Sequence, residues 1–322
     1  MNKVKWAMVG TGIIGNEFAK AFNANNAELI AVGSRTKEKA QAFADKYDIP
    51  KAYGSYDEVY GDEEIDVVYF GTPNSHHAQN MIDALNAGKH VFCEKAITMN
   101  KKELDEVIEL ATKKNLIVAE AMTIYHMPVY HEIKHRIDNG EFGDLKLATA
   151  YFGSLKDEDP NQRFFNPELG GGALLDIGVY ALSFVQFFLN SNPVEFNTIV
   201  QMHPSGVDDK STISYTTEDK TLANVILSFR GKLPKQGVVA CELAHITFNE
   251  YPRADQALIT YHDGKTEVVN AGDTNQALNY EVENISKTIL TGDDFTNIDN
   301  TIRVNYLMDK AASEWGMNWI FE

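Results

Sequence analysis

The stretch "VKWAMVGTGIIG", residues 4–15, predicts how the first third of the chain folds. Its mostly apolar residues 4–9 are typical of a buried strand, and the glycine-rich turn that follows opens a helix. Gly10, Gly12 and Gly15 match the spacing Gly-x-Gly-x-x-Gly. Between a strand and a helix, this spacing indicates a turn whose backbone N–H groups hold a pyrophosphate at the helix N-terminus.

Strand-like and helix-like segments alternate from this stretch to about residue 121. Further strands are predicted at 28–34, 65–72, 89–94 and 116–121, with amphipathic helices between them. This alternation indicates right-handed βαβ units and a parallel, doubly wound sheet.

The pattern changes near residue 122. Helices are predicted near 127–138 and 172–189 and at the end of the chain, and most other segments are strand-like runs with short turns between them. These runs lie at 144–152, 194–201, 211–217, 221–229, 236–246, 256–262 and 266–270. Short turns predict a largely antiparallel sheet. We therefore expect an α/β chain with a Rossmann domain at 1–122 and an α+β domain at 123–322.

Composition and charge exclude several classes of protein. The 322 residues suffice for two domains, and Asp plus Glu outnumber Lys plus Arg by 46 to 29, a net charge of -17. Such a chain, without a clustered basic stripe, repels phosphate backbones, so no nucleic-acid partner is expected. The apolar run 181–189 is too short to span a bilayer, and no signal peptide is evident. Cys93 and Cys241 fit a reducing interior, so we expect a cytoplasmic protein without a membrane partner.

The end of the second predicted strand bears on the choice of dinucleotide. NAD-binding folds usually carry an acid there, about 20 residues beyond the glycine turn, that holds the ribose 2′-hydroxyl. This chain has Ser34, Arg35 and Thr36, and its next acid is Glu38, inside the following helix. A guanidinium flanked by two hydroxyls suits a 2′-phosphate, so the pattern favours NADP(H) and leaves NAD(H) open. The alternative is that Arg35 is a solvated charge at the start of a helix.

A second polar pattern lies in "LGGGALLDIGVYAL", residues 169–182. The predicted helix is apolar nearly all round, yet it carries Asp176 and Tyr180 one turn apart and therefore on one face. Polar groups on a buried helix need partners or a cavity. The spacing leaves open whether the two form an internal hydrogen-bonded pair or belong to a functional site.

Four ordered motifs resemble the family of glucose–fructose oxidoreductase, inositol dehydrogenase and rhizopine-catabolism proteins (GFO/IDH/MocA). They are "GTGIIG" (10–15), "TPNSHH" (72–77), "AGKHVFCEK" (87–95) and "GGGALLDIGVY" (170–180). The resemblance covers the first domain and the first half of the second. Within the family, the chain is most similar to the branch of dimeric dihydrodiol dehydrogenases and NADP-xylose dehydrogenases.

The resemblance implies an NADP(H)-dependent oxidoreductase that transfers hydride between nicotinamide and a secondary alcohol or carbonyl of a sugar, polyol or cyclic diol. The implied catalytic residues are Lys95, Asp176 and Tyr180. The implied cofactor-binding residues are Gly10, Gly12, Ile13, Ile14, Gly15, Ser34, Arg35, Thr36, Thr72, Pro73, Asn74, His77, Glu94 and Lys95. The resemblance also implies a homodimer or homotetramer that forms through the C-terminal sheet.

Elementary chemistry agrees with these roles. Oxidation of a secondary alcohol needs a base for the hydroxyl proton, and a tyrosine, which titrates near pH ~10 in water, needs help to act at neutral pH. An ammonium such as that of Lys95 stabilises a phenolate and can hold the substrate oxygen. No metal is expected.

Three features depart from the family pattern. Ala96 stands where proline usually follows the lysine, and the residues 123–125, Thr-Ile-Tyr, stand where this branch often has Trp-Thr-Arg. The second departure changes the expected substrate pocket. His76 is an extra histidine beside His77, and we expect it at the surface or at the rim of the site.

A zinc protease is a rival hypothesis, because "HEIKH" (131–135) matches His-Glu-x-x-His. The apolar stripe Val129, Ile133 and Ile137 counts against it, because it leaves both histidines facing largely away from the core side of their helix.

A second rival is a non-catalytic, NADP-binding regulatory protein of the same fold, because fold does not dictate activity. The presence of Lys95, Asp176 and Tyr180 together argues against it.

Overall fold

A computed structural model describes residues 3–159 and 163–321. The chain forms two compact units. The first comprises Met1–Thr98, Lys102–Ala121 and Asn275–Ile298, and the second comprises Met99–Lys101, Met122–Thr274 and Asp299–Glu322.

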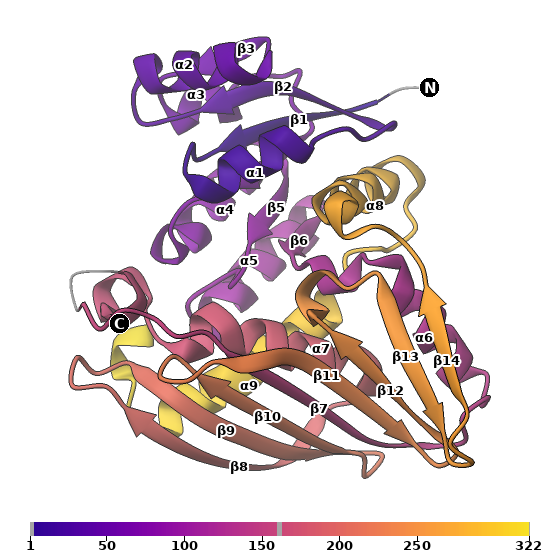
Figure 1. Ribbon diagram of the computed structural model, residues 1–322. Helices are drawn as coiled ribbons and strands as arrows, with labels where there is room; N and C mark the ends of the chain where they lie inside the picture. The colour runs from indigo at the N-terminus through magenta and orange to yellow at the C-terminus, as the bar shows by residue number, and fades with distance from the viewer. Residues whose placement is uncertain (1–2, 160–162, 322) are drawn as a thin grey trace. The chain divides into compact units, whose positions relative to one another are not determined.

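The first unit contains a six-stranded parallel sheet in the order β3-β2-β1-β4-β5-β6 (Figure 1). Its strands are β1 (Val4–Val9), β2 (Ala27–Gly33), β3 (Lys51–Tyr53), β4 (Val67–Phe70), β5 (His90–Glu94) and β6 (Val118–Ala121). This is the strand order of doubly wound dinucleotide-binding sheets, so the predicted parallel sheet is confirmed. The three-residue strand β3 was not predicted, because it is too short to show a periodicity.

Helices connect these strands. They are α1 (Ile13–Ala21), α2 (Lys37–Tyr47), α3 (Tyr56–Tyr60), α4 (His77–Asn86) and α5 (Lys101–Lys114). The hydroxyl of Thr36 caps α2, and Ser55 and Glu58 form a capping box at the start of the short α3. Trp6, Phe18, Tyr69 and Phe92 are among the large aromatic side chains of the core.

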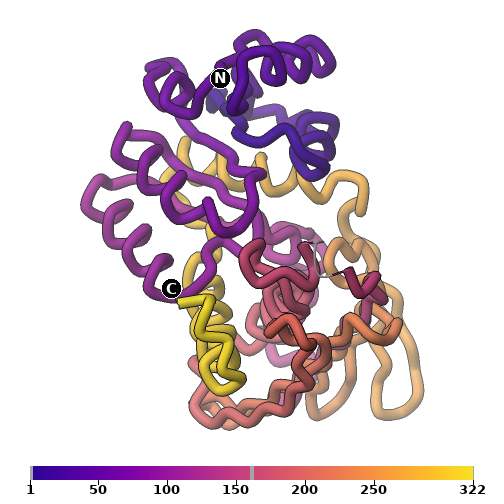
Figure 2. The backbone as a smooth tube through the Cα atoms, turned by 90° about the vertical axis from the view of Figure 1, so that its left-hand side faces the viewer, coloured from indigo at the N-terminus to yellow at the C-terminus, as the bar shows by residue number. Residues whose placement is uncertain are grey.

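One helix lies in a different unit from the one expected. The sequence boundary assigned all of 123–322 to the second domain, but α8 (Ala277–Thr291) belongs to the first unit (Figure 2). Its side chains Val282 and Ile285 are buried in the core that contains Trp6, and the Trp6 indole Nε1 donates to Ser286 Oγ at 2.9 Å. The apolar stripe of α8 indicated a helix that packs on a core but carried no information about which core.

The second unit contains an eight-stranded sheet in the order β14-β13-β12-β11-β7-β10-β9-β8. Only the β7–β10 pair is parallel, so the predicted largely antiparallel sheet is confirmed. The strands are β7 (Leu145–Gly153), β8 (Pro193–Met202), β9 (Asp208–Thr217), β10 (Leu222–Ser228), β11 (Leu233–Cys241), β12 (Ala244–Asn249), β13 (Gln256–Tyr261) and β14 (Thr266–Asn270).

One predicted strand of this sheet is wrong. The run 236–246 was expected to be continuous, but it is divided between β11 and β12. The backbone N–H groups of Glu242 and Leu243 donate to the carbonyl oxygens of Asp144 and Phe142, which turns the chain between the two strands.

Three helices and a π-helical turn complete the second unit: α6 (Pro128–Asp138), the turn Leu174–Gly178, α7 (Val179–Leu189) and α9 (Ile298–Glu314). Helix α7 lies on one face of the sheet, against β7, β10 and β11 (Figure 1). Gly237 in β11 allows this contact, because a Cβ there would lie 2.3 Å from the ring of Phe184. The same ring contacts Phe248 and Tyr251, so aromatic packing fixes α7 on the sheet.

The apolar stretch that contains α7 is longer than the run 181–189 considered in the sequence analysis. Pro167–Leu189 is long and apolar enough to cross a membrane by length and composition, although the run 181–189 alone was judged too short. Within the fold, 89% of the most apolar 18-residue part of this stretch is buried, which is typical of the core helix of a folded domain.

Candidate functional site

Four predicted segments meet at one edge of the parallel sheet, because the carboxyl ends of parallel strands share an edge. The glycine turn follows β1, Ser34 follows β2, Thr72 follows β4 and Lys95 follows β5. Backbone hydrogen bonds join the first three segments: the N–H of Gly10 donates to the carbonyl of Gly33 at 3.3 Å, and the N–H of Gly71 donates to the carbonyl of Val9 at 2.9 Å.

The glycine turn has the geometry that a dinucleotide needs. A Cβ at Gly10, where φ is +104°, would lie 2.5 Å from the carbonyl oxygen of Gly71, and one at Gly15 would lie 2.3 Å from the carbonyl oxygen of Gly10. Gly12 instead faces open space and precedes α1 without a side-chain cap. The first N–H groups of α1 therefore lack a capping side chain and suit a pyrophosphate. Ile13, 85% exposed in this first turn, gives a ligand an apolar surface to cover.

The three residues after β2, residues 34–36, differ in their exposure and contacts. Ser34 is buried, whereas Arg35 and Thr36 are exposed. The Thr36 hydroxyl accepts the Lys39 N–H at 3.4 Å as the cap of α2. This use of Thr36 was not foreseen, and it leaves Arg35 as the exposed cation at this strand end.

His77 is fully buried and lies between two backbone oxygens. Its Nε2 lies 2.8 Å from the carbonyl oxygen of Thr72 and its Nδ1 lies 3.0 Å from that of Ala96. Burial lowers the pKa of His77, which favours the neutral ring with one N–H to donate. The neutral ring can donate to only one of these two carbonyl oxygens, and it packs between the segment after β4 and the segment after β5. Its neighbour His76 is exposed, as predicted.

Lys95 follows a buried acid at the end of β5. The Glu94 carboxylate accepts the hydroxyl of Tyr69 at 2.8 Å and the N–H of Lys95 at 3.3 Å. Burial, and then the Glu94 charge, raise the pKa of Tyr69 well above its ordinary value, so the phenol stays a donor. Glu94 is thus bonded to a core tyrosine, and Lys95 is partly exposed. The other predicted cofactor residues, Ile14, Pro73 and Asn74, lie at or near the strand ends described above.

In the second unit, Asp176 and Tyr180 are partly exposed, whereas every other residue from 171 to 189 is buried. The predicted shared polar face is therefore present. Asp176 Oδ1 accepts from Arg163 Nη2 at 2.9 Å, and its Oδ2 lies 3.9 Å from Lys156 Nζ. Two cations of the loop before the helix thus hold this carboxylate.

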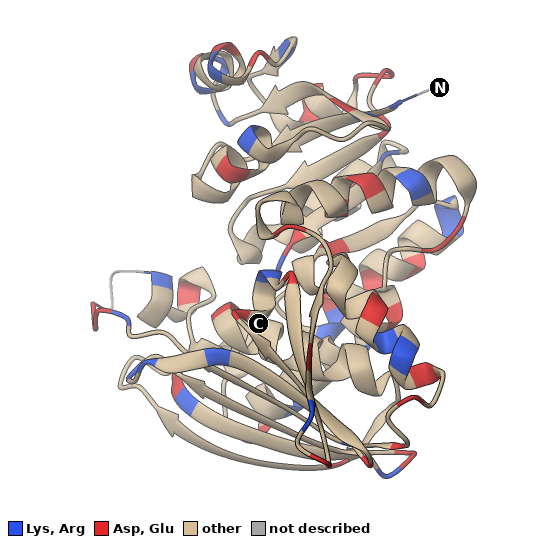
Figure 3. Ribbon diagram, turned by 45° about the vertical axis from the view of Figure 1, so that its right-hand side comes forward, with Lys and Arg blue, Asp and Glu red and all other residues tan. Residues whose placement is uncertain are grey.

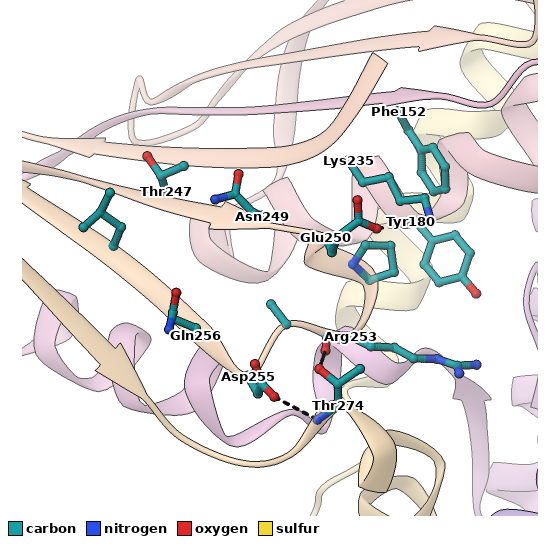
Figure 4. Close-up of a pocket in the computed structure, with 13 residues that line it drawn as sticks. Phe152, Tyr180, Lys235, Thr247, Asn249, Glu250, Arg253, Asp255, Gln256 and Thr274 are labelled. Atoms are coloured by element: carbon teal, nitrogen blue, oxygen red, sulfur yellow. Dashed lines mark hydrogen bonds and ion pairs between the residues drawn. The ribbon is translucent and has the colours of Figure 1, made fainter. Parts of the chain in front are cut away.

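Tyr180 lines a cavity of about 630 Å³ in the second unit (Figure 4). The remaining lining side chains are mostly polar: Phe152, Lys235, Thr247, Asn249, Glu250, Pro252, Arg253, Ala254, Asp255, Gln256, Leu258 and Thr274. The Tyr180 and Phe152 rings lie 6.2 Å apart, and Lys235 Nζ lies 5.3 Å from the Phe152 ring centroid and 3.4 Å from Glu250 Oε2. In Figure 4, the Tyr180 hydroxyl and the Arg253 guanidinium extend to the same side.

The unusual segment 123–125 lies beneath this pocket and does not line it. All three residues are buried. The Thr123 hydroxyl donates to the carbonyl of Pro252, and the Tyr125 hydroxyl donates to Ser183 Oγ at 3.1 Å. Thr123 thus contacts the turn at Pro252, which lines the cavity.

Four charged residues near these sites were not predicted: Lys156, Arg163, Lys235 and Arg253. They lie in loops or near strand ends, where no periodicity or short motif marks them. Only the mixed charge of "SLKDEDPNQR" and "NEYPRAD" beside apolar segments could have drawn attention to them.

The two histidines of "HEIKH" have separate neighbours. His131 Nε2 lies 2.8 Å from the carbonyl oxygen of Tyr125, and its ring packs on Phe187, but the residue is exposed, as the apolar stripe predicted. His135 Nε2 lies 3.0 Å from Asn139 Nδ2. Within 3–159 and 163–321, no group of three or more His, Cys, Asp or Glu side chains is arranged to hold a metal ion.

Both halves of the chain match family models. Residues 4–122 match "Oxidoreductase family, NAD-binding Rossmann fold", and residues 130–247 match "GFO/IDH/MocA C-terminal domain". The trans-1,2-dihydrobenzene-1,2-diol dehydrogenase of Xenopus laevis is 32% identical over 97% of this chain and 98% of its own length.

Solved structures share the fold. An aldose-aldose oxidoreductase from Caulobacter crescentus, complexed with glycerol, aligns with a TM-score of 0.85 and 23% identity over 97% of this chain and 98% of its own. A 3-ketoreductase from Actinomadura kijaniata, in complex with NADP and TDP-benzene, aligns with a TM-score of 0.82 and 21% identity over 96% of each chain. Identities this low bear on the fold alone.

We predict that catalysis needs no metal held by "HEIKH". The double variant His131→Ala, His135→Ala should keep turnover within a few-fold of the unmodified protein, because the two rings have different hydrogen-bond partners, Tyr125 and Asn139, and do not converge on one point. Lys134→Ala on the same helix controls for helix stability, and activity should survive dialysis against a chelator. Stoichiometric zinc, lost together with activity, would contradict the prediction.

Proposed function

Because this chain belongs to the GFO/IDH/MocA family of oxidoreductases and is an enzyme of the dehydrogenase or reductase type, we propose that it uses NADP(H) to interconvert a secondary alcohol and a carbonyl of a sugar or polyol. The observation that carries the proposal is the partial exposure of Tyr180, on an otherwise buried helix, at the wall of a polar cavity. A fold alone supplies no reason to expose a phenol there.

The lining of the cavity supports a hydroxyl-rich substrate. It offers donors such as Lys235 and Arg253 and acceptors such as Glu250 and Asp255, together with the amides Asn249 and Gln256. A polyhydroxylated ring can satisfy donors and acceptors together, and Phe152 supplies an apolar surface beside Tyr180. A cyclic diol, the compound in the name of the Xenopus relative, has fewer groups to pair, so we favour a sugar or polyol.

The roles in the reaction follow from the chemistry of each side chain. The nicotinamide, when bound, donates or accepts the hydride. Tyr180 exchanges the hydroxyl proton of the substrate at its phenolic oxygen. The Lys95 ammonium stabilises the phenolate and orients the substrate oxygen. Asp176, held by Arg163 and Lys156, fixes the loop before the helix, so its charge is shared with that loop.

We predict that NADPH binds more tightly than NADH and that Arg35→Ala removes most of the difference. The lost charge-assisted contact to a 2′-phosphate is worth on the order of 2 kcal/mol. Calorimetric titration with both cofactors measures it. NADH affinity serves as the internal control and should stay unchanged, and Arg35→Lys should keep part of the preference. Equal affinities in the unmodified protein would contradict the assignment.

We predict that Tyr180→Phe lowers turnover by about two to four orders of magnitude, the usual effect of losing a positioned proton-transfer group. Lys95→Met should cost a similar amount. The double variant should be far less impaired than the product of the two single effects, because the groups act together. Turnover is followed by cofactor absorbance with a panel of sugars and polyols.

Two controls separate chemistry from folding. NADPH binding should survive in both single variants, and Tyr125→Phe, a buried phenol outside the cavity lining, should leave turnover nearly unchanged. If Tyr180→Phe kept nearly full turnover with chemistry rate-limiting, the tyrosine would be structural. A protein that binds NADPH but turns over no substrate would favour the regulatory alternative.

We also propose that the face of the eight-stranded sheet opposite α7 binds a second copy of the chain. One row on this face crosses all eight strands: Asn197, Ser214, Asn224, Thr149, Val238, Thr247, Leu258 and Val268. Two of its members, Thr247 and Leu258, also line the cavity at Tyr180, so the proposed interface borders the proposed substrate site. It contains no charged residue, although 23% of the chain is charged. In Figure 3, the middle of these strands is largely tan. Glu195 lies on the same face at the edge strand β8, but a central row without charge across so wide a sheet is typical of a surface that another protein covers.

This proposal predicts a dimer or tetramer of the 36.0 kDa chain in light scattering after gel filtration. Val238→Glu, which places a charge in the middle of the row, should shift the population towards monomer. Leu290→Glu, at an exposed position of α8, is the matched control and should leave the mass unchanged. A monomeric unmodified protein would overturn the proposal.

We further infer a cytoplasmic location. Cys93 and Cys241 are both free thiols, which agrees with a reducing compartment.

A further inference from the structure

Asp208, at the start of β9, contacts the N-terminal end of the helix that carries the proposed catalytic groups. Its side chain is fully buried, and its Oδ2 accepts the backbone N–H of Leu174 at 2.9 Å. Leu174 opens the π-helical turn that continues into α7. Asp176 and Tyr180 follow it by two and six residues, so this contact lies at the end of the helix where both groups are exposed.

The helix has no cap of its own at this end. The residue before the turn is Ala173, which provides no side-chain hydrogen bond, so the first N–H groups need acceptors from elsewhere. Asp208 supplies one from a neighbouring strand. Its carboxylate also lies at the positive end of the helix dipole, where a negative charge is stabilised.

The position of Asp208 is costly to the fold. Its second oxygen, Oδ1, has no hydrogen-bond partner among the residues that the structure describes. Burial raises the pKa of Asp208 to about 7, against the opposing effects of the backbone N–H groups of Leu174, Asp208 and Ala173, while the neighbouring Asp209 raises it further. Buried polar atoms without partners are rare in folded proteins and require an explanation.

The glycine run before the helix makes room for this carboxylate. A Cβ at Gly172, where φ is +106°, would lie 2.4 Å from Asp208 Oδ1. A Cβ at Gly171 would lie 2.8 Å from the carbonyl oxygens of Arg163 and Asn166. The helix start is therefore packed between Asp208 and the loop whose Arg163 holds Asp176.

We propose that Asp208 is a positioning residue of the reaction, which holds the first turn of the helix at Leu174 so that Tyr180 faces the substrate. The catalytic part of this inference rests on the proposed function. The mechanical part, that Asp208 orders the helix start, does not. The body of α7 is already fixed by Phe184 against β11 and β12, so the fold as a whole does not depend on Asp208.

Three variants of the full-length protein test the proposal. Asp208→Ala removes the acceptor. Asp208→Asn keeps an acceptor oxygen of the same reach and loses the charge. Asp209→Ala is the matched control, because Asp209 is also buried and also has an oxygen without a partner among the described residues, but no hydrogen bond recorded for its side chain reaches the helix.

Two readouts are measured for each variant. The first readout is kcat per NADPH-binding site together with KM, measured with the sugar of the panel that the unmodified protein turns over best. Tyr180→Phe is assayed in parallel. The second is amide hydrogen exchange of peptides that cover residues 173–182, together with the melting temperature. Asp208→Ala should lower kcat about 10- to 100-fold, the cost of a displaced catalytic group, with little change in NADPH affinity. It should also speed exchange in these peptides, and Asp208→Asn should restore both values to within a few-fold.

The outcomes distinguish the mechanical part of the proposal, the ordering of the helix start, from its catalytic part. Unchanged exchange in Asp208→Ala would overturn the inference whatever the activity. Equal losses of kcat in Asp208→Ala and Asp209→Ala would reduce Asp208 to a general stability role and overturn it too, as would an Asn variant that fails as badly as Ala. Faster exchange together with an active Tyr180→Phe would support the positioning of the helix while the proposed function fails.

Discussion

The close approach of two backbone turns, at Gly10 and Gly71, is the constraint on which the cofactor half of the protein depends. Strands β1 and β4 are parallel neighbours, so the turns that follow them meet at one edge, and any side chain at Gly10 would collide with a carbonyl oxygen. The same edge receives Arg35 after β2 and Lys95 after β5. Buried polar contacts then hold these segments: His77 lies between two loop carbonyls, and Glu94 accepts from Tyr69. The turns are thereby held by the sheet and its core.

In the second unit, too, a packed core holds the exposed polar residues in place, but it does so with a helix on an antiparallel sheet. Aromatic packing fixes α7 against the sheet, and the helix exposes only Asp176 and Tyr180 between residues 171 and 189. The charges around them, on Arg163, Lys156, Lys235 and Arg253, come from loops and strand ends. A packed helix thus positions the phenol of Tyr180, whereas loops and strand ends supply the charges around it.

The sequence predicted the parts of this structure that are marked by a periodic pattern of apolar residues or by a short motif. The parallel sheet, the glycine turn, the shared face of Asp176 and Tyr180 and most strands of the second sheet were all correct, because each depends on local order in the chain. The partners of these residues were not predictable. Nothing near Asp176 in the sequence indicates Arg163 as its ion-pair partner, and nothing near Leu174 indicates Asp208, because these contacts depend on tertiary packing. The apolar stripe of α8 and the buried ring of His77 were ambiguous for the same reason.

The assignment of α8 to the first unit has a consequence for how the protein is made. A ribosome releases the chain from its N-terminus, so β1 to β6 emerge well before Val282 and Ile285, which complete their core. The whole eight-stranded sheet, encoded by the residues between, emerges in the interval. The core of the N-terminal unit is therefore complete only after the residues of the second sheet have been translated. The two units are nested in the chain, so neither can be separated from the other by a single cut in the sequence.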